Sequence, residues 1–540
     1  MLSEKRSVPA LITQTLNFFL HTIKTQWLFI IILVVGIFAR IWQFGDIPPG
    51  LNPDEASIGV EAYYIFKFGM DRNGISYPIH LIAWGSGQNA LYAYLIMPFV
   101  ALRGLNSESI RLPMLLSGIL SLPLIYFAGR QLWGHKFGLL VMFFMAISPW
   151  HIVNSRWAVE SNIFPFIFLL GFVFFLQAGR NGGWFIPASI CFALSLYSYG
   201  TAYIAIPVFL LFGVPALIYF KKIKTSHVIS GLLIFSILAL PIALFVMINI
   251  LDLNPIHIGS MTIPRLPVEA RYESLAAVFG KSPLTAIMEN VVIMFDLLWK
   301  QEDDFVWNFV SPFGYFYKLT FPLIAIGFFF LVASFKQVKE NRFERWLLLS
   351  WIIASLTIGI IHPVNLTRFN LIFTPILFCI AVCLVEFNKH FKYTMPIALV
   401  ALSVGFVFFT QAYHYGADYQ RRASEAFNAG IIPAIEYASE NSSSIICVTD
   451  QTRFAYIYTL FVVKIQPSEY LSSIEWLLPE FHPVDPARSP RALGLFRFKM
   501  SDCMEDPQAV YILKLKETPP NLEVEYKSRT FKKYLVFLPK

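Results

Sequence analysis

Two adjacent carboxylates, Asp54 and Glu55, stand in the segment GLNPDEASIG at residues 50–59, directly after the first long apolar stretch of the chain. A carboxylate is mostly deprotonated at neutral pH, so it can accept a proton from a reacting hydroxyl group. The same segment also fits a helix start, with Asn52 as the cap, Pro53 in the first position and Glu55 three residues after the cap. The pair therefore predicts either a general base or a helix terminus.

Other side chains that suit chemistry on a phosphate or a hydroxyl group occur in three further segments. They are His80 in SYPIHLIAWGSGQNALY, Arg156 and Glu160 in MAISPWHIVNSRWAVESN, and His362, Asn365 and Arg368 in IIHPVNLTRFNLIFTP. Arginine suits phosphate because its planar fork donates two parallel hydrogen bonds. Each residue also has a structural alternative, such as an arginine that reaches lipid headgroups or a glutamate in a capped loop.

The composition places these residues in a membrane protein. Of the 540 residues, 56% are hydrophobic and 14% are charged, whereas soluble proteins carry about 25% charged residues. Apolar stretches near the ~20 residues needed to cross a bilayer recur from Gln26 to Tyr413. The net charge is +8, and the basic residues lie between these stretches. Membrane orientation requires basic residues there, so nucleic-acid binding is not predicted.

We predict a polytopic α-helical protein with about eleven spans. They lie near 27–44, 111–129, 137–152, 162–178, 184–198, 201–220, 228–250, 319–335, 346–362, 368–387 and 394–413. The apolar segment 89–104 is short and contains Pro98. Counting it as a span would move nearly all later basic clusters, such as Lys221 and Lys222, to the outside, against the positive-inside rule. We therefore predict a helix on the outer surface there, and a cytoplasmic or interfacial segment at 1–26.

With this topology, the membrane domain covers 27–413 and three long parts face outward: 45–110, 251–317 and 414–540. The last part changes composition. An amphipathic helix and several strands, among them QAVYILKLK and KKYLVFLPK, predict a small extracytoplasmic α/β domain. Cys447 and Cys503 lie in it and would be able to pair in an oxidising compartment, although the sequence does not fix the distance between them.

The order of these features resembles a known family. The outward acidic pair after the first span is followed by a surface helix and by SIRLPMLLSGILSLPLIYFAGRQLWG as the second span, and the third span ends in ISPWHIVNSRWAVESN. This pattern is similar to the C-type membrane glycosyltransferases (GT-C), above all the protein O-mannosyltransferases and lipid A aminoarabinose transferases of glycosyltransferase family 39. The resemblance covers residues 27–180 well and the later spans only in general layout. It implies the GT-C fold, and transfer of a sugar from a polyprenyl-phosphate donor to an acceptor hydroxyl outside the plasma membrane, with inversion.

The resemblance also implies roles for the acidic residues. Asp54 matches the catalytic base of the family and Glu55 its neighbour. The resemblance implies inversion, whereas a retaining mechanism would use a second carboxylate, Glu55, as the nucleophile. Glu160 takes the place of the acid in the second outward loop, beside Arg156. Here the sequence departs from the family, which has Asp five residues after the arginine, whereas this chain has Glu four residues after it. On a helix, one residue turns a side chain by about 100°.

The leaving phosphate needs a cation. Arg368 is the first candidate and Arg156 the second; Lys318 and Arg265 in or beside the loop 251–317 are further ones. His80, Asn365 and His362 are candidates for the donor or acceptor pocket. A divalent ion held by Asp54, Glu55 or Glu160 would serve the same purpose, so the need for a metal stays open.

Two other function classes would require different sequence features. A lipid-linked glycan polymerase or ligase would rely on arginines in a large late loop rather than on an early acidic pair. A lipid or sugar transporter would carry ionisable groups near the membrane midplane, and the predicted spans have almost none in their cores. The glycosyltransferase is therefore the main prediction, with membrane lipids around it and the acceptor, whether glycan, lipid or protein, left open.

Overall fold

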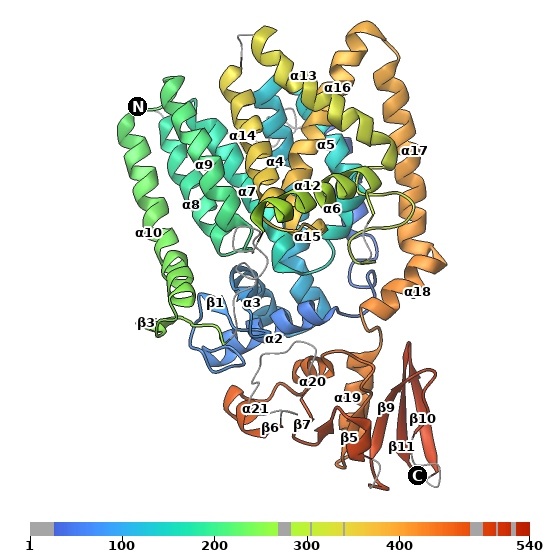
Figure 1. Ribbon diagram of the computed structural model, residues 1–540. Coiled ribbons are helices and arrows are strands. Elements are labelled where there is room, and N and C mark those ends of the chain that lie inside the picture. Colours follow the sequence, from blue (N-terminus) through green and yellow to red (C-terminus); the bar gives the residue numbers. More distant parts are fainter. Residues whose placement is uncertain are drawn as a thin grey trace, which may run out of the picture.

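The computed structural model describes residues 26–267, 282–302, 305–337, 341–475, 490–503, 506–519 and 525–540. The predicted N-terminal segment 1–26 lies almost wholly outside them. The protein consists of a helical bundle and a smaller α/β domain at one end of it (Figure 1). The long helices run roughly along one direction, and the shorter helices α2 and α3 lie between the bundle and the α/β domain.

Eight helical segments of the described residues are long and apolar enough to cross a membrane. They are α4 (Ser107–Trp133), α7 (Glu160–Ala178), α9 (Ala202–Tyr219), α10 (Thr225–Ile250), Lys318–Phe335 with α13 (Phe321–Gln337), α14 (Arg342–Ile361), Leu366–His390 with α15 (Leu366–Phe369) and α16 (Phe373–His390), and α17 (Thr394–Tyr415). The prediction of a polytopic helical membrane protein is confirmed.

The other three predicted spans are shorter apolar helices: Gln26–Ile41, α5 (His135–Ile147) and Gly182–Leu196, which contains α8 (Phe185–Leu196). The predicted span 137–152 is divided, because α5 ends at Ser148 and Pro149 begins the short helix α6 (Pro149–Asn154). Ser148 is extended, with φ −63° and ψ 121°, because proline disfavours the helical conformation in the residue before it, and Pro149 suits the first position of the next helix. The number eleven therefore stays a prediction.

The segment 45–110 folds into two helices and a hairpin. α2 (Pro53–Phe68) starts with the predicted cap: the Asn52 side chain accepts the Asp54 N–H, and Glu55 reaches back to the Asn52 N–H. It ends at Gly69, which adopts φ 71°, a conformation that glycine reaches without strain. The surface helix predicted at 89–104 is α3 (Leu91–Arg103).

The hairpin between α2 and α3 carries candidate residues. β1 (His80–Leu81) pairs antiparallel with β2 (Gln88–Asn89), so that His80 stands opposite Asn89. The second long loop contributes β3 (Ile256–Ile258), β4 (Met261–Ile263) and α12 (Pro283–Lys300). The Ile79 N–H donates to the Thr262 carbonyl, which ties β4 to the hairpin.

The C-terminal domain contains α18 (Ala417–Ala426), α19 (Ile431–Asn441), α20 (Ala455–Val463), α21 (Pro467–Ser473) and a seven-stranded mixed sheet in the order β10-β11-β9-β5-β8-β7-β6. The strands are β5 (Ile446–Val448), β6 (Ile474–Glu475), β7 (Ala492–Leu493), β8 (Phe496–Arg497), β9 (Val510–Lys514), β10 (Tyr526–Phe531) and β11 (Tyr534–Pro539). β5 runs parallel to both β8 and β9. The strands predicted in QAVYILKLK and KKYLVFLPK are β9 and β11.

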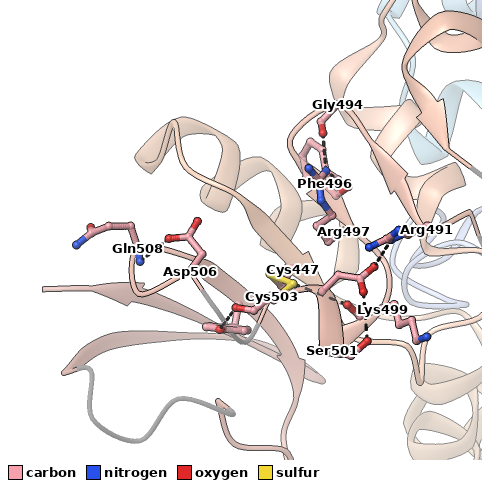
Figure 2. The surroundings of a disulfide bond; sticks show 12 residues. Cys447, Arg491, Gly494, Phe496, Arg497, Lys499, Ser501, Cys503, Asp506 and Gln508 are labelled. Carbon is pink, nitrogen blue, oxygen red and sulfur yellow. Dashed lines mark hydrogen bonds and ion pairs between the residues drawn. A yellow bond between two sulfur atoms is a disulfide. The ribbon is translucent and has the colours of Figure 1, made fainter.

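Two contacts fix this domain internally and to the bundle. Figure 2 shows the disulfide between Cys447 of β5 and Cys503 of a short 3-10 helix, with a Cα–Cα distance of 6.3 Å. One cluster of buried apolar side chains continues from α2 through α20 into β9 and β11, for example Ile58, Leu460 and Ile512. The C-terminal domain therefore shares its core with the helix that carries Asp54.

Candidate active site

A polar cavity of about 110 Å³ lies where five segments of the chain meet at the end of the bundle. It is lined by His80, Ser86, Gly87, Gln88, Asn89, Glu160, Tyr199, Gly200, Thr201, Tyr203, Leu266, His362 and Arg368. The cavity thus brings together four residues that the sequence singled out from three distant segments: His80, Glu160, His362 and Arg368. The space holds several water-sized groups, enough for a phosphate group or part of a sugar ring.

The acid of the cavity is Glu160, the first residue of α7. Its side chain is 9% exposed, and its Oε2 accepts a hydrogen bond of 2.8 Å from Gln88 Nε2. A helix N-terminus favours a negative charge. Since Glu160 lies on the cavity wall, the one-residue shift from the family pattern does not turn its side chain away.

Two buried polar atoms on the wall have no hydrogen-bond partner in the structure: Gln88 Oε1 and Thr201 Oγ1. Their residues are 5% and 7% exposed. A buried polar atom that loses water without gaining a partner costs about 1–3 kcal/mol. These atoms are therefore suited to bind hydroxyl groups of a ligand, Gln88 Oε1 as acceptor and Thr201 Oγ1 as donor or acceptor.

His80 is held as a neutral ring. It stacks on Phe245 with 4.1 Å between ring centroids, and its Nδ1 lies 3.2 Å from the Leu81 carbonyl, to which it donates. Burial lowers the pKa of His80 to about 4, because the charged form loses its hydration. At neutral pH the imidazole contributes an acceptor at Nε2 and no charge.

The cation of the cavity is Arg368. Asn365 begins α15 as its cap and accepts the Arg368 N–H at 3.0 Å, and one guanidinium nitrogen donates to the Pro363 carbonyl at 3.1 Å. Most of the guanidinium fork has no further hydrogen bond to the described residues. Asn365 does not line the cavity, so the structure gives it a positioning place on the Arg368 backbone rather than the predicted place in the pocket.

Asp54 does not line this cavity but is linked to its wall through neighbouring residues. It is partly buried, and its Oδ1 accepts a hydrogen bond of 3.1 Å from Trp84 Nε1. Trp84 leads directly into the cavity segment Ser86–Asn89, and the neighbour of Asp54 binds the N–H of Ala158, two residues before Glu160. Asp54 is thus joined to two of the segments that form the cavity wall.

Glu55 has a different place from its neighbour. It is fully buried, and its oxygens accept four hydrogen bonds: from the Asn52 N–H, the Ala158 N–H and both Nε and Nη2 of Arg111, the last two at 2.7 Å. Arg111 is also fully buried and donates to the Pro48 and Gly50 carbonyls. With every acceptor site in use, Glu55 is positioned for structure, which argues against its predicted catalytic role.

Three predicted phosphate ligands have other partners in the structure. Arg156 is fully buried and donates to the carbonyls of Arg40, Trp42, Gln43 and Ile47, so it holds the loop after the first helix in place. Lys318 forms an exposed ion pair with Glu302 and does not line the cavity. Arg265 pairs with Asp252 in the same way. Arg368 is therefore the one predicted cation that these contacts leave as a phosphate ligand.

A buried charge cluster at the end of α2 was not predicted from the sequence. Arg72 donates its backbone N–H to Glu61 at 3.0 Å, and the two side chains form an ion pair at 3.3 Å; both are almost completely buried. Arg72 also lies 5.0 Å over the Trp84 ring. The cluster supports Trp84, and through it the hydrogen bond to Asp54. Adjacent charges after a helix-ending glycine, as in GMDR, are the only signal in the sequence.

Asp71 makes this cluster sensitive to pH. Burial, followed by the nearby Glu61 carboxylate, raises the pKa of Asp71 to about 8, far above its ordinary value of 3.8. The folded protein therefore keeps a proton that the unfolded chain releases above pH 4. The contribution of Asp71 to stability is present below about pH 4 and declines as the pH rises towards 8.

We expect Asp71→Asn to remove this decline, because the amide mimics the protonated acid and keeps the oxygen that accepts the Asn73 and Ile75 N–H groups. Thermal unfolding between pH 5 and 8 measures the effect. The melting temperature of the variant, relative to that of the native protein, should increase as the pH rises. Asp46→Asn, at an exposed carboxylate of the preceding loop, is the control. A difference that is the same at every pH would contradict the assignment.

Among the described residues, no three His, Cys, Asp or Glu side chains come together as a metal site. Glu160, His80 and His362 line one cavity without forming such a group.

Comparison with known proteins agrees with this architecture. Residues 88–245 match the sequence profile of a family described as dolichyl-phosphate-mannose-protein mannosyltransferase. The structure is similar to that of ArnT from Cupriavidus metallidurans in the apo state, with a TM-score of 0.55 and 12% identity over 95% of this chain and 98% of that one. The chain has the fold of a C-type membrane glycosyltransferase. The resemblance to the protein O-mannosyltransferase and ArnT superfamily is thereby confirmed.

Further structures are similar to this GT-C fold. ArnT from the same organism bound to undecaprenyl phosphate matches with a TM-score of 0.54 and 12% identity over 96% of this chain and 98% of that one. The oligosaccharyltransferase AglB from Archaeoglobus fulgidus, in complex with an inhibitory peptide and a dolichol-phosphate, has a TM-score of 0.48 and 14% identity over 82% of this chain. This chain covers 64% of AglB. No curated protein sequence matches the chain. The profile match is confined to residues 88–245, and the similarity to ArnT shows the fold.

Proposed function

We propose that the protein transfers a sugar from a polyprenyl-phosphate donor to an acceptor hydroxyl group, in the polar cavity between the hairpin β1–β2 and the N-termini of α7 and α15. The observation that carries the proposal is the meeting of Glu160, Arg368 and the unpaired amide oxygen of Gln88 around one cavity whose wall is linked to Asp54. ArnT, whose fold the chain shares, was solved with undecaprenyl phosphate.

The charges of the cavity suit the leaving phosphate. A phosphate diester that leaves the anomeric carbon gains negative charge, and a guanidinium group donates two hydrogen bonds to it in a fixed geometry. Arg368 stands at the first turn of α15 after an apolar helix, where a donor headgroup meets the end of the bundle. The prenyl chain would lie along the apolar helices beside it.

The carboxylates Asp54 and Glu160 suit the acceptor hydroxyl group and the hydroxyl groups of the sugar. In an inverting transfer, the acceptor oxygen attacks the face of the sugar opposite the phosphate while a base takes its proton. We assign this base to Asp54, which Trp84 links to the cavity wall. Glu160 and Gln88 form one hydrogen-bonded pair on the wall, and we assign them to the sugar hydroxyl groups. Sugar and acceptor stay unnamed because the cavity offers hydroxyl-binding groups of several kinds.

The active site and the C-terminal domain are proposed to face the extracytoplasmic side of a plasma membrane, with the N-terminus in the cytoplasm. The disulfide between Cys447 and Cys503 supports this orientation, because disulfides persist in oxidising compartments and are rare in the cytosol. Thiol alkylation of unreduced, denatured protein from cells tests it: only the buried cysteines Cys191, Cys379 and Cys383 should react. Five modified cysteines would place the domain in the cytoplasm.

A substitution that fills the cavity tests the proposed function. Gly200 lines it, and an added Cβ there meets no atom within 4 Å, so Gly200→Leu occupies the space at little backbone cost. We expect cells with this variant to accumulate a polyprenyl-phosphate sugar, which lipid mass spectrometry detects and whose mass identifies the sugar. Cells with the native protein should not accumulate it.

Gly183→Leu is the matched control, because Gly183 lies in a 3-10 helix away from the cavity and an added Cβ there meets only the Asn181 side chain at 3.4 Å. It should give the native lipid profile. If the folded Gly200→Leu variant also gives the native profile, the cavity is not the donor site. A pyrophosphate-linked glycan in its place would indicate the lipid-linked polymerase or ligase instead.

A further inference from the structure

A second, larger cavity lies at the other end of the bundle. It is an apolar groove of about 990 Å³ between the helix Gln26–Ile41, α5, α13, α16 and α17. α17 starts at the end of the bundle far from the C-terminal domain and runs back to α18 beside it (Figure 1), and the groove contacts its first turns through Met395 and Leu399. The groove is thus separate from the polar cavity, and nothing in the proposed transfer uses it.

Among the described residues, the helix Gln26–Ile41 approaches the bundle most closely near its C-terminal end, although Phe29 also contacts Tyr126, with 4.8 Å between ring centroids. A Cβ on Gly36 would lie 2.6 Å from Leu122 and 3.1 Å from Ala146, so the backbones approach closely there. One turn later, Arg40 is fully buried and donates to the carbonyls of Met145 and Ala146. Towards the other end, Leu28, Ile31 and Val35 line the groove and remain 38–51% exposed.

The depth of the groove matches one leaflet of a bilayer. On α5 the lining runs from Lys136 to Ile147, which at 1.5 Å per residue is about 16 Å, half of the ~30 Å hydrocarbon core of a membrane. A transmembrane helix of a partner would need a face along the whole depth. Acyl chains of a lipid in one leaflet fit the length that is present.

The open end of the groove carries charge. Lys136 at the start of α5 and Lys389 at the end of α16 both line it, with Trp133, and Lys389 forms an ion pair of 2.7 Å with Glu386. Two cations and one anion leave the rim positive. Lysine side chains that extend from apolar surface to headgroup depth attract anionic lipids.

We propose that this groove is a binding site for an anionic phospholipid of the leaflet opposite the C-terminal domain. The acyl chains lie between the helix Gln26–Ile41 and α5, and the phosphate lies between Lys136 and Lys389. The bound lipid packs against the face of the first helix that Leu28, Ile31 and Val35 present to the groove. The proposal does not depend on the catalytic role of the other cavity.

Native mass spectrometry of the purified full-length protein, with phosphatidylglycerol or phosphatidylcholine added, tests the site. Each lysine near a headgroup is worth about 1 kcal/mol, so Lys136→Gln with Lys389→Gln should weaken phosphatidylglycerol binding roughly thirtyfold. Phosphatidylcholine binding should change little. Equal phosphatidylglycerol binding by the native protein and this double variant would overturn the proposal.

A second pair of variants separates the groove from the general lipid surface. Val35→Trp fills the groove, whereas Val34→Trp places the same ring on the neighbouring residue, which is 57% exposed and does not line it. We expect the tightly held lipid to be lost from Val35→Trp and kept in Val34→Trp. Retention in both variants, or polyprenyl phosphate as the tightly held lipid, would refute the assignment. If Val35→Trp fails to fold, the lysine variants, which change only exposed side chains, still decide.

Discussion

Asp54→Asn is expected to fold like the native protein and to lower the rate of sugar transfer by about 10²–10⁴-fold, the usual contribution of a general base. The amide keeps the size of the side chain and an oxygen that accepts the Trp84 N–H, but it cannot take a proton from the acceptor. The measurement is the initial rate of transfer from purified donor lipid, together with lipid mass spectrometry of cells. The donor lipid should accumulate in cells with the variant. The affinity of the variant for the donor should stay within a few fold of that of the native protein.

Asp46→Asn is the control for this experiment, because Asp46 is exposed in the loop before α2 and does not line the cavity. A folded Asp54→Asn protein that keeps more than a tenth of the native rate would remove Asp54 as the base. Glu160, which already lies on the cavity wall, would then be the residue to change. If Gly200→Leu were also without effect, the failure would concern the proposed function and not only the choice of base.

Local patterns in the sequence predicted the elements well, because each depends on residues close together in the chain. The cap at Asn52 and Glu55 forms as the spacing predicts, since a capping box involves only four consecutive residues. The helix α3 appears where the basic loops required a surface segment. The strands β9 and β11 form in the two short apolar segments where strands were predicted.

The roles of individual charges could not be predicted in the same way, because their partners are distant in sequence. Arg156 looked like a phosphate ligand, but its acceptors are backbone carbonyls more than one hundred residues earlier. No role was predicted for Arg111. An arginine near the start of an apolar span costs free energy unless it has a partner inside the protein, so its position indicates such a partner. The sequence placed Glu55 correctly on its helix and could not show that Arg111 would occupy its oxygens.

The disulfide likewise depends on residues that are distant in sequence. Cys447 and Cys503 are 56 residues apart, and their pairing depends on how β5 lies in the sheet, between β8 and β9. No local pattern sets that strand order. The domain was therefore predictable as α/β from its segments, whereas its topology and its attachment to α2 through a shared core required the tertiary structure.

Glu55→Gln should have the opposite result to Asp54→Asn: a lower stability of the folded protein, by about 3–5 kcal/mol. The substitution leaves the Arg111 guanidinium charged and fully buried without its counter-ion, and breaking a buried pair by removing one partner costs this much because the remaining charge stays desolvated. The measurement is unfolding by heat or denaturant in detergent. The double variant Glu55→Gln with Arg111→Gln should recover part of the loss, since no unpaired charge remains.

Glu108→Gln is the matched control for Glu55→Gln. Its partner Arg103 also pairs with it closely, at 2.5 Å, but the two side chains are 44% and 50% exposed, so the pair is worth at most about 1 kcal/mol. Equal losses in the two variants would mean that Glu55 is not held as an essential buried anion, and a catalytic role for it would return. A large loss at Glu55 alone would distinguish the two adjacent carboxylates by burial, because Glu55 is fully buried against Arg111 whereas Asp54 is partly buried.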